Sequence, residues 1–153
     1  MKTRRDFLIG LGAAVVLPSL AVAEGGVLSA GQAMQGLADG TLILIDLRTP
    51  EEWQDTGVAR GAWPLDMTQH SFGGDLLRVI ERNPQHQVAV ICRTGRRSAY
   101  MVEVLERNGI HGVLDVSEGM AGGRNGRGWI PSGLPTVTAE EALARLPGDL
   151  TVR

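Results

Sequence analysis

The stretch Val88-Ala89-Val90-Ile91-Cys92-Arg93-Thr94-Gly95-Arg96-Arg97-Ser98 decides the fold of this 153-residue chain. Its first four residues are apolar, which predicts a buried strand, and residues 98–108 predict the helix that follows. A loop between a strand and a helix N-terminus directs backbone N–H groups and the positive end of the helix dipole at a bound anion. The stretch therefore predicts an anion site at the end of a strand, and it contains the only cysteine of the chain.

Cys92 is a candidate nucleophile, because nearby cations and a helix N-terminus favour the reactive thiolate over the thiol. A single cysteine cannot form an internal disulfide. The alternative is a buried, inert cysteine, against which the neighbouring arginines argue. We expect the N–H groups of residues 92–97 to converge on the sulfur, and the sulfur to be reachable from water.

The residues after Cys92 are candidate substrate-binding residues. The arginines would attract and orient an anion, the hydroxyl groups would donate hydrogen bonds, and the glycine permits a tight curve. They are Arg93, Thr94, Gly95, Arg96, Arg97 and Ser98.

The rest of the chain alternates strand and helix patterns. Apolar runs predict strands at residues 42–45, 61–65, 88–91 and 113–116, and helical spacing or capping residues predict helices at 29–39, from 49, at 75–83, 98–108 and 138–146. Strands that alternate with helices predict an α/β fold with a parallel sheet covered by helices on both faces. Ligands of such sheets bind beyond the carboxyl ends of the strands, where Asp46 and Cys92 both fall.

The loop Cys-Arg-Thr-Gly-Arg-Arg-Ser resembles the active-site loop of the rhodanese-like family of single-domain sulfurtransferases. Residues 42–53 with 57–62 are similar to the Asp-x-Arg turn and Gly-His-Ile-x-Gly-Ala signature of that family, and Glu118-Gly119-Met120, Trp129 and Gly133-Leu134-Pro135 are similar to its closing elements. The resemblance covers about residues 29–137. Two features depart from it: Val58 replaces the usual histidine, and the connection at residues 122–128 is longer.

The resemblance implies a small three-layer rhodanese-like domain over residues 24–153, in which Cys92 carries sulfur as a persulfide. The partners it implies are an anionic donor such as thiosulfate and a thiol or cyanide acceptor, with a sulfur-carrier protein as a further partner. It also implies that Asp46 and Arg48 support the turn beside the active-site loop. The alternative function is a persulfide carrier or interaction domain without turnover.

A cysteine phosphatase is the chemical rival of this interpretation. Such enzymes need Cys-x5-Arg, with the arginine on the phosphoryl oxygens. The position six residues after Cys92 is Ser98 rather than arginine, which favours sulfur transfer.

The composition predicts no cofactor, metal or nucleic-acid partner. His70, His86 and His111 are scattered and lack the spacing of metal ligands. The 15 basic and 17 acidic residues nearly balance, so charge does not favour nucleic acid.

The N-terminus has the pattern of an export signal. Thr3-Arg4-Arg5-Asp6-Phe7-Leu8 is a twin-arginine run, followed by an apolar stretch and by Ala21-Val22-Ala23. We expect residues 1–23 to be a Tat signal peptide, cleaved after Ala23, and the protein to be periplasmic. The alternative is an uncleaved anchor, which would be the one contact with a membrane; the segment is shorter than the ~20 apolar residues of a spanning helix.

Overall fold

The computed structural model describes residues 26–150, in which five parallel strands form a central sheet. The order across the sheet is β1-β6-β5-β2-β4, so β5, the strand before Cys92, lies in the middle. The parallel sheet predicted from the sequence is confirmed. The strands are β1 (Val27–Leu28), β2 (Leu42–Asp46), β4 (Trp63–Pro64), β5 (Gln87–Ile91) and β6 (Leu114–Val116).

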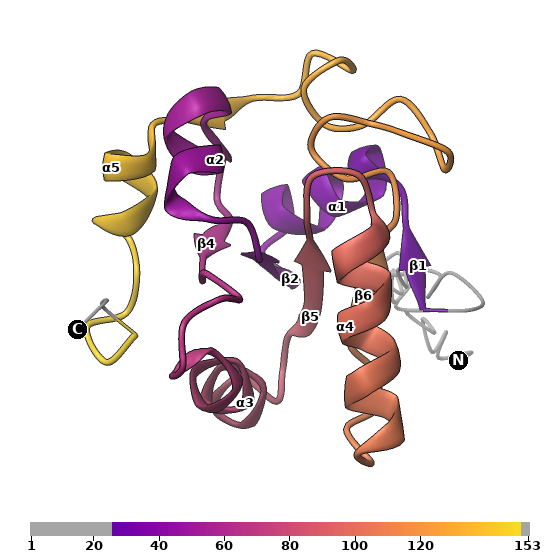
Figure 1. Ribbon diagram of the computed structural model, residues 1–153. Coiled ribbons are helices and arrows are strands. Elements are labelled where there is room, and N and C mark those ends of the chain that lie inside the picture. Colours follow the sequence, from indigo (N-terminus) through magenta and orange to yellow (C-terminus); the bar gives the residue numbers. More distant parts are fainter. Residues whose placement is uncertain (1–25, 151–153) are drawn as a thin grey trace, which may run out of the picture.

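Helices cover both faces of the sheet, as the sequence predicted, and α4 lies alongside β5 and β6 (Figure 1). Successive side chains of a strand point to opposite faces, so β2 contributes to two separate cores. Leu42 and Leu44 pack in the core with α1, α2 and α5, whereas Ile43 and Ile45 pack in the core with α3 and α4. The helices are α1 (Ala30–Ala38), α2 (Pro50–Thr56), α3 (Phe72–Arg82), α4 (Arg96–Arg107) and α5 (Ala139–Leu143).

Capping boxes begin three of the helices. The hydroxyl groups of Ser29, Thr49 and Thr138 each accept a hydrogen bond from a backbone N–H in the first turn of α1, α2 and α5. In return, the side chain of the glutamine or glutamate three residues later accepts a hydrogen bond from the backbone N–H of the capping residue. Such reciprocal bonds satisfy N–H groups that a helix start leaves free. These helix starts were recognisable from the sequence.

Two helices begin earlier than predicted. α4 starts at Arg96 rather than at residue 98, because Gly95 takes the left-handed conformation at the N-cap and allows the chain to turn directly into the helix. α3 starts at Phe72 rather than at residue 75. Gly73 and Gly74 have low helix propensity and hid its first turn.

Short strands were the least predictable elements. β1 was missed, as were β3 (Val58–Ala59) and β7 (Thr136–Val137), which pair with each other in a second, antiparallel sheet. Each has two residues, too few for a periodic pattern. The strand predicted at 61–65 is shorter in the structure and corresponds to β4. This is an edge strand, and its Pro64 has no N–H to donate.

The expected export signal lies outside the described residues. Between residues 26 and 150, none of the helices has the length and apolar character needed to cross a bilayer.

Candidate active site

Cys92 lies directly after the carboxyl end of β5, at the start of a short loop that leads through Gly95 into α4. The loop is fixed by backbone bonds from the segment that follows β6. Met120 N–H donates to the carbonyl of Cys92 at 2.9 Å, and Ala121 N–H donates to that of Arg93 at 2.8 Å. The structure therefore confirms that Cys92 lies at the end of a strand, as the sequence predicted.

Within the described part of the chain, both hydrogen bonds to the sulfur come from Ser98. Its backbone N–H donates to Cys92 Sγ at 3.4 Å, and its hydroxyl group lies 3.4 Å from the same atom. The expected ring of converging amides over residues 92–97 is thus reduced to one N–H from the first turn of α4 and one hydroxyl group. Ser98 is fully buried and reaches the sulfur itself.

The sulfur is less accessible than the sequence led us to expect. Cys92 is only 1% exposed. Arg93, Thr94 and Arg96 of the same loop are, by contrast, exposed to water.

The three arginines of the loop are not equivalent. Arg93 and Arg96 are exposed and form no ion pair within residues 26–150. Arg97 is half-buried and forms a two-pronged ion pair with Glu52 of α2, with N–O distances of 2.8 and 2.6 Å. Arg93 and Arg96 are therefore the loop cations that remain free to meet an anion.

The Glu52–Arg97 pair ties α4 to α2. The hydrogen bond from Arg97 lowers the pKa of Glu52, against the opposing effect of burial. The hydrogen bond with Glu52 raises the pKa of Arg97 further, against the opposing effect of burial, and smaller electrostatic contributions come from Glu52, Cys92 and Asp46. Arg97 thus places a permanent positive charge near the sulfur, and the ion pair with Glu52 fixes the orientation of its guanidinium group.

Asp46 and Arg48 form a buried ion pair at the end of β2. Arg48 donates through Nη2 to Asp46 Oδ2 at 2.7 Å and through Nε to both carboxylate oxygens. The same guanidinium donates to Thr56 Oγ1 and to the carbonyl of Gly57, each at 2.7 Å. The pair therefore joins β2, whose Asp46 is in register with Ile91 of β5, to the end of α2.

Two glycines allow the loop and the segment after β6 to approach closely. A Cβ on Gly95, whose φ is +85°, would lie 1.9 Å from the carbonyl oxygen of Ser117. A Cβ on Gly119 would lie 2.5 Å from the carbonyl oxygen of Arg93. No side chain fits at either position without movement of the backbone.

The glycine-rich connection at residues 122–128 is a tight, exposed turn structure. Gly123 and Gly126 form an isolated bridge, and Gly128 N–H donates to Glu118 Oε2 at 3.0 Å. A Cβ on Gly123 would lie 3.4 Å from the backbone oxygen of Thr94, so this connection packs close to the cysteine loop.

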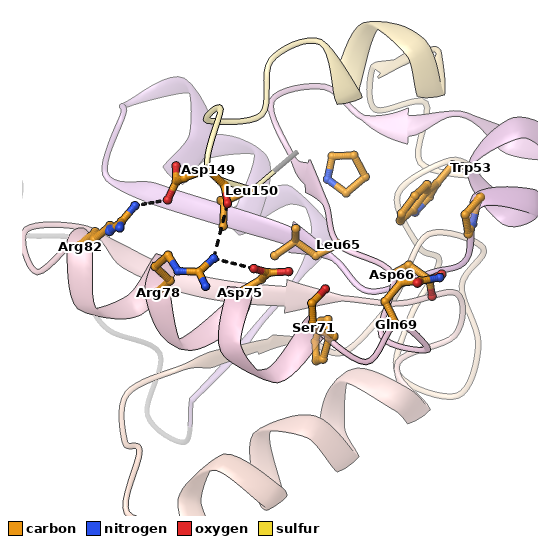
Figure 2. A pocket seen from close by; sticks show the side chains of 13 residues that line it. Trp53, Leu65, Asp66, Gln69, Ser71, Asp75, Arg78, Arg82, Asp149 and Leu150 are labelled. Atoms are coloured by element: carbon orange, nitrogen blue, oxygen red, sulfur yellow. Dashed lines mark hydrogen bonds and ion pairs between the residues drawn. The ribbon is translucent and has the colours of Figure 1, made fainter. Parts of the chain in front are cut away.

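The cavities of the described residues differ in their relation to the loop. A small one of about 90 Å³ has Arg93, Glu52 and Ala121 in its walls. A larger one of about 420 Å³ lies between α3 and the turn after α5 (Figure 2). Two ion pairs lie in its lining: Arg78 binds Asp75 at 2.6 Å and Arg82 binds Asp149. We place the candidate site at the cysteine loop, because the lining of the larger cavity includes neither Cys92 nor an arginine of its loop.

No group of three or more potential metal ligands occurs among residues 26–150. His111 is on the surface and pairs with Glu106.

Comparison with known protein families tests the resemblance that the cysteine loop indicated. The model of the rhodanese-like domain family matches residues 29–125, more than half of the chain. The chain belongs to the rhodanese-like domain family. This family is of the sulfurtransferase type, and the resemblance inferred from the sequence is confirmed at that level.

Similar proteins agree with this assignment. An uncharacterized protein of Rickettsia rickettsii is 25% identical over 108 residues, which cover 65% of this chain and 85% of the relative. The crystal structure of Rv0390 from M. tuberculosis is 26% identical with a TM-score of 0.56, over 74% of this chain and 98% of that one. The rhodanese-like domain of the Anabaena sp. Alr3790 protein shares the fold, with a TM-score of 0.54 and 19% identity over 80% of this chain and 85% of that one.

Two departures of this chain from the family signature have clear places in the structure. Val58, at the position of the usual histidine, is fully buried in β3 and pairs with Val137. It contributes to the apolar core beside α2 instead of a polar contact. The second departure is the turn structure at residues 122–128.

Residues that interact with the loop from outside it were missed at the sequence level. Glu52 was recognised only as an acidic residue in the first turn of a helix, and it lies 45 positions from Arg97. Asp115 carried no signal beyond its place in a predicted strand. A buried acidic residue in an otherwise apolar strand was the one hint that the sequence contained.

Proposed function

We propose that Cys92 accepts sulfane sulfur from a small anionic donor such as thiosulfate and passes it to a thiol or cyanide. In the first step the Cys92 thiolate attacks the outer sulfur of thiosulfate. The S–S bond of the donor breaks, sulfite leaves with the bonding electrons, and Cys92 becomes a persulfide. In the second step the acceptor attacks the outer sulfur, and the Cys92 thiolate is restored.

The observation that carries the proposal is the position of Cys92 between β5 and α4 in a chain of the rhodanese-like family. The Ser98 N–H is a donor to negative charge on the sulfur. In this proposal Arg93 and Arg96 attract the anionic donor, Thr94 donates from the rim, Gly95 forms the turn, and Arg97 stabilises the thiolate. Asp46 and Arg48 support the loop from β2.

Turnover tests the proposal. The protein without residues 1–23, mixed with thiosulfate and cyanide, should release thiocyanate continuously, and Cys92→Ser should release none. The double variant Arg93→Ala/Arg96→Ala should raise KM for thiosulfate by about tenfold, because two unpaired cations are lost at the entry. Thiocyanate release by Cys92→Ser at the wild-type rate would contradict the proposal.

A second function is favoured by the burial of Cys92. A sulfur that is 1% exposed suits a domain that holds a persulfide and delivers it to a docked sulfur-carrier protein, without rapid turnover to small acceptors. The two functions differ in one result. A carrier forms one persulfide per chain with thiosulfate but gives no continuous thiocyanate release, whereas an enzyme gives both.

We also propose that the protein is exported to the periplasm through the Tat pathway and cleaved after Ala23. The support is the sequence of residues 1–23 alone. Arg4→Lys/Arg5→Lys should leave the protein in the cytoplasm, and N-terminal sequencing of the exported wild type should begin at Glu24. Exported protein that begins at Met1 would show an uncleaved anchor.

A further inference from the structure

The glycine-rich connection at residues 122–128 lies beside the cysteine loop, at the end of the sheet where α4 begins (Figure 1). Its Gly123 packs close to the backbone of Thr94. Asn125 Nδ2 donates to the carbonyl oxygen of Ser117 at 3.2 Å, and the glycine of the cysteine loop packs against this same oxygen. The connection and the cysteine loop therefore form one surface.

This surface carries a concentrated positive charge. Residues 92–98 and 122–128 contain five of the 15 basic residues of the chain and none of its 17 acidic residues. Arg97 is paired with α2, whereas the other four arginines are exposed and take part in none of the ion pairs formed between residues 26 and 150. We call these four the basic surface: Arg93, Arg96, Arg124 and Arg127. On a chain with a net charge of −2, such a surface attracts anions locally.

The connection holds its backbone in a defined conformation. Gly123 and Gly126 exchange backbone hydrogen bonds of 3.0 and 3.4 Å, and Arg124 lies between them in the chain. The N–H of Gly128 donates to Glu118 at 3.0 Å, so this carboxylate is engaged by the backbone of the connection. A backbone that is already ordered loses less entropy when a partner binds than a flexible loop does.

Two exposed apolar side chains border the basic surface. Tyr100 is 57% exposed and lies one helical turn after Arg96, on the same face of α4. Ile130 is 37% exposed and lines the cavity of about 90 Å³ together with Arg93. Asp55 adds an acidic side chain to the wall of that cavity. Arginine and tyrosine are enriched where proteins bind other proteins, so the composition of this border fits a protein partner.

We propose that the basic surface docks an acidic segment of a partner protein that accepts sulfur from Cys92. The carboxylates of this segment bind the arginines of the connection, and one of its apolar side chains packs on Tyr100. A partner thiolate then attacks the outer sulfur of the Cys92 persulfide. The S–S bond breaks, its electron pair stays on the Cys92 sulfur, and the partner becomes the persulfide. The inference rests on the proposed function for the sulfur that is transferred, whereas docking depends on the arginines.

An acidic protein segment fits this surface better than other anions do. Thiosulfate is small, and the two exposed arginines of the cysteine loop suffice to attract it, which leaves Arg124 and Arg127 without a use. A nucleic acid is bound through many phosphates by a domain with a broad excess of basic residues, and this chain has an excess of acidic ones. The proposal thus gives a use to a departure of this chain from the family signature.

Docking is measured separately from sulfur transfer. Cys92→Ser cannot form a disulfide with a thiol probe, because the chain has no other cysteine. The probe is a fluorescently labelled peptide with one cysteine and one leucine among glutamates, and its neutral counterpart has glutamine in place of each glutamate. Fluorescence anisotropy should show that the acidic peptide binds at least about tenfold more tightly than the neutral one. Its affinity should fall as the ionic strength rises, because exposed charges are screened by salt.

The arginines of the connection are tested by Arg124→Gln/Arg127→Gln in the same Cys92→Ser background. This change should weaken binding of the acidic peptide by about tenfold and leave binding of the neutral peptide unchanged. The matched control is Arg60→Gln/Arg145→Gln. It removes the same charge from two exposed arginines that lie near Glu141, outside the cysteine loop and the connection. The control should weaken binding by less than about twofold, since its charges are screened from the docked peptide.

Sulfur transfer is then followed with Cys92 present. The protein is loaded with sulfur from thiosulfate and mixed with the acidic peptide at a concentration well below saturation. The initial rate of transfer to the peptide should fall by about tenfold in Arg124→Gln/Arg127→Gln. Thiocyanate release from thiosulfate and cyanide should change by less than about twofold, because cyanide needs no docking surface.

Equal affinity for the acidic and neutral peptides would overturn the inference, as would equal losses in Arg124→Gln/Arg127→Gln and in the control. A single-stranded oligonucleotide that binds more tightly than the acidic peptide, and loses affinity in the same variant, would also overturn it. So would self-association of the wild type that this variant abolishes, because the surface would then bind a second copy. Absence of sulfur transfer with peptide binding intact would instead contradict the proposed function alone.

Discussion

Gly95→Ala should abolish detectable sulfur transfer and lower the free energy of unfolding by more than about 3 kcal/mol. The left-handed φ of +85° alone costs an alanine roughly 1–2 kcal/mol. The larger effect comes from the new Cβ, which would lie 1.9 Å from the carbonyl oxygen of Ser117. Relief of this clash moves the cysteine loop away from the segment that fixes it, and with it the Ser98 N–H that reaches Sγ. Denaturant unfolding and thiosulfate turnover measure the two effects.

Gly112→Ala is the matched control for this change. Gly112 has nearly the same φ, +84°, but nothing lies within 4 Å of its Cβ position. The control should lose only the roughly 1–2 kcal/mol of backbone strain and keep its activity. Equal losses in both variants would show that the close approach at Gly95 has no special importance.

Arg48→Met should lower the free energy of unfolding by about 3–5 kcal/mol. The substitution leaves the fully buried Asp46 carboxylate without its cation and removes the shorter of the two hydrogen bonds to the carbonyl of Gly57. A buried charge without a partner is costly, whereas a pair removed as a whole costs much less. Denaturant unfolding of Arg48→Met and of Asp46→Asn/Arg48→Met therefore separates the cost of the unpaired buried charge from the cost of lost packing.

We expect the double variant to recover part of the stability that Arg48→Met loses. Arg107→Met provides the surface control, because Arg107 and its partner Glu103 are 67% and 55% exposed. It should change stability by less than about 1 kcal/mol. If Arg48→Met cost no more than Arg107→Met, the buried pair would not brace the loop.

The sequence allowed the central strands and the position of Cys92 to be predicted because these features are local. β2 and β5 are continuous apolar runs, and Ser29, Thr49 and Thr138 cap helices with partners three residues away. The sequence also allowed the family to be recognised, since the motifs lie in order along the chain.

The remaining features depend on contacts between distant segments. The partner of Arg97 lies 45 positions away, and the vacant oxygen of Asp115 is a consequence of its place between two apolar strands. The cysteine loop is fixed by hydrogen bonds from the segment after β6, which donates through Met120 and Ala121. No periodicity or motif encodes these distances.

The most direct test of the central claim is the mass of the intact protein after incubation with thiosulfate and removal of the excess. The claim is that Cys92 accepts sulfur although it is 1% exposed in this structure. Wild type should gain the mass of one sulfur atom and lose it on treatment with cyanide, while Cys92→Ser should gain nothing. An unchanged wild-type mass, or the same gain in Cys92→Ser, would contradict the account.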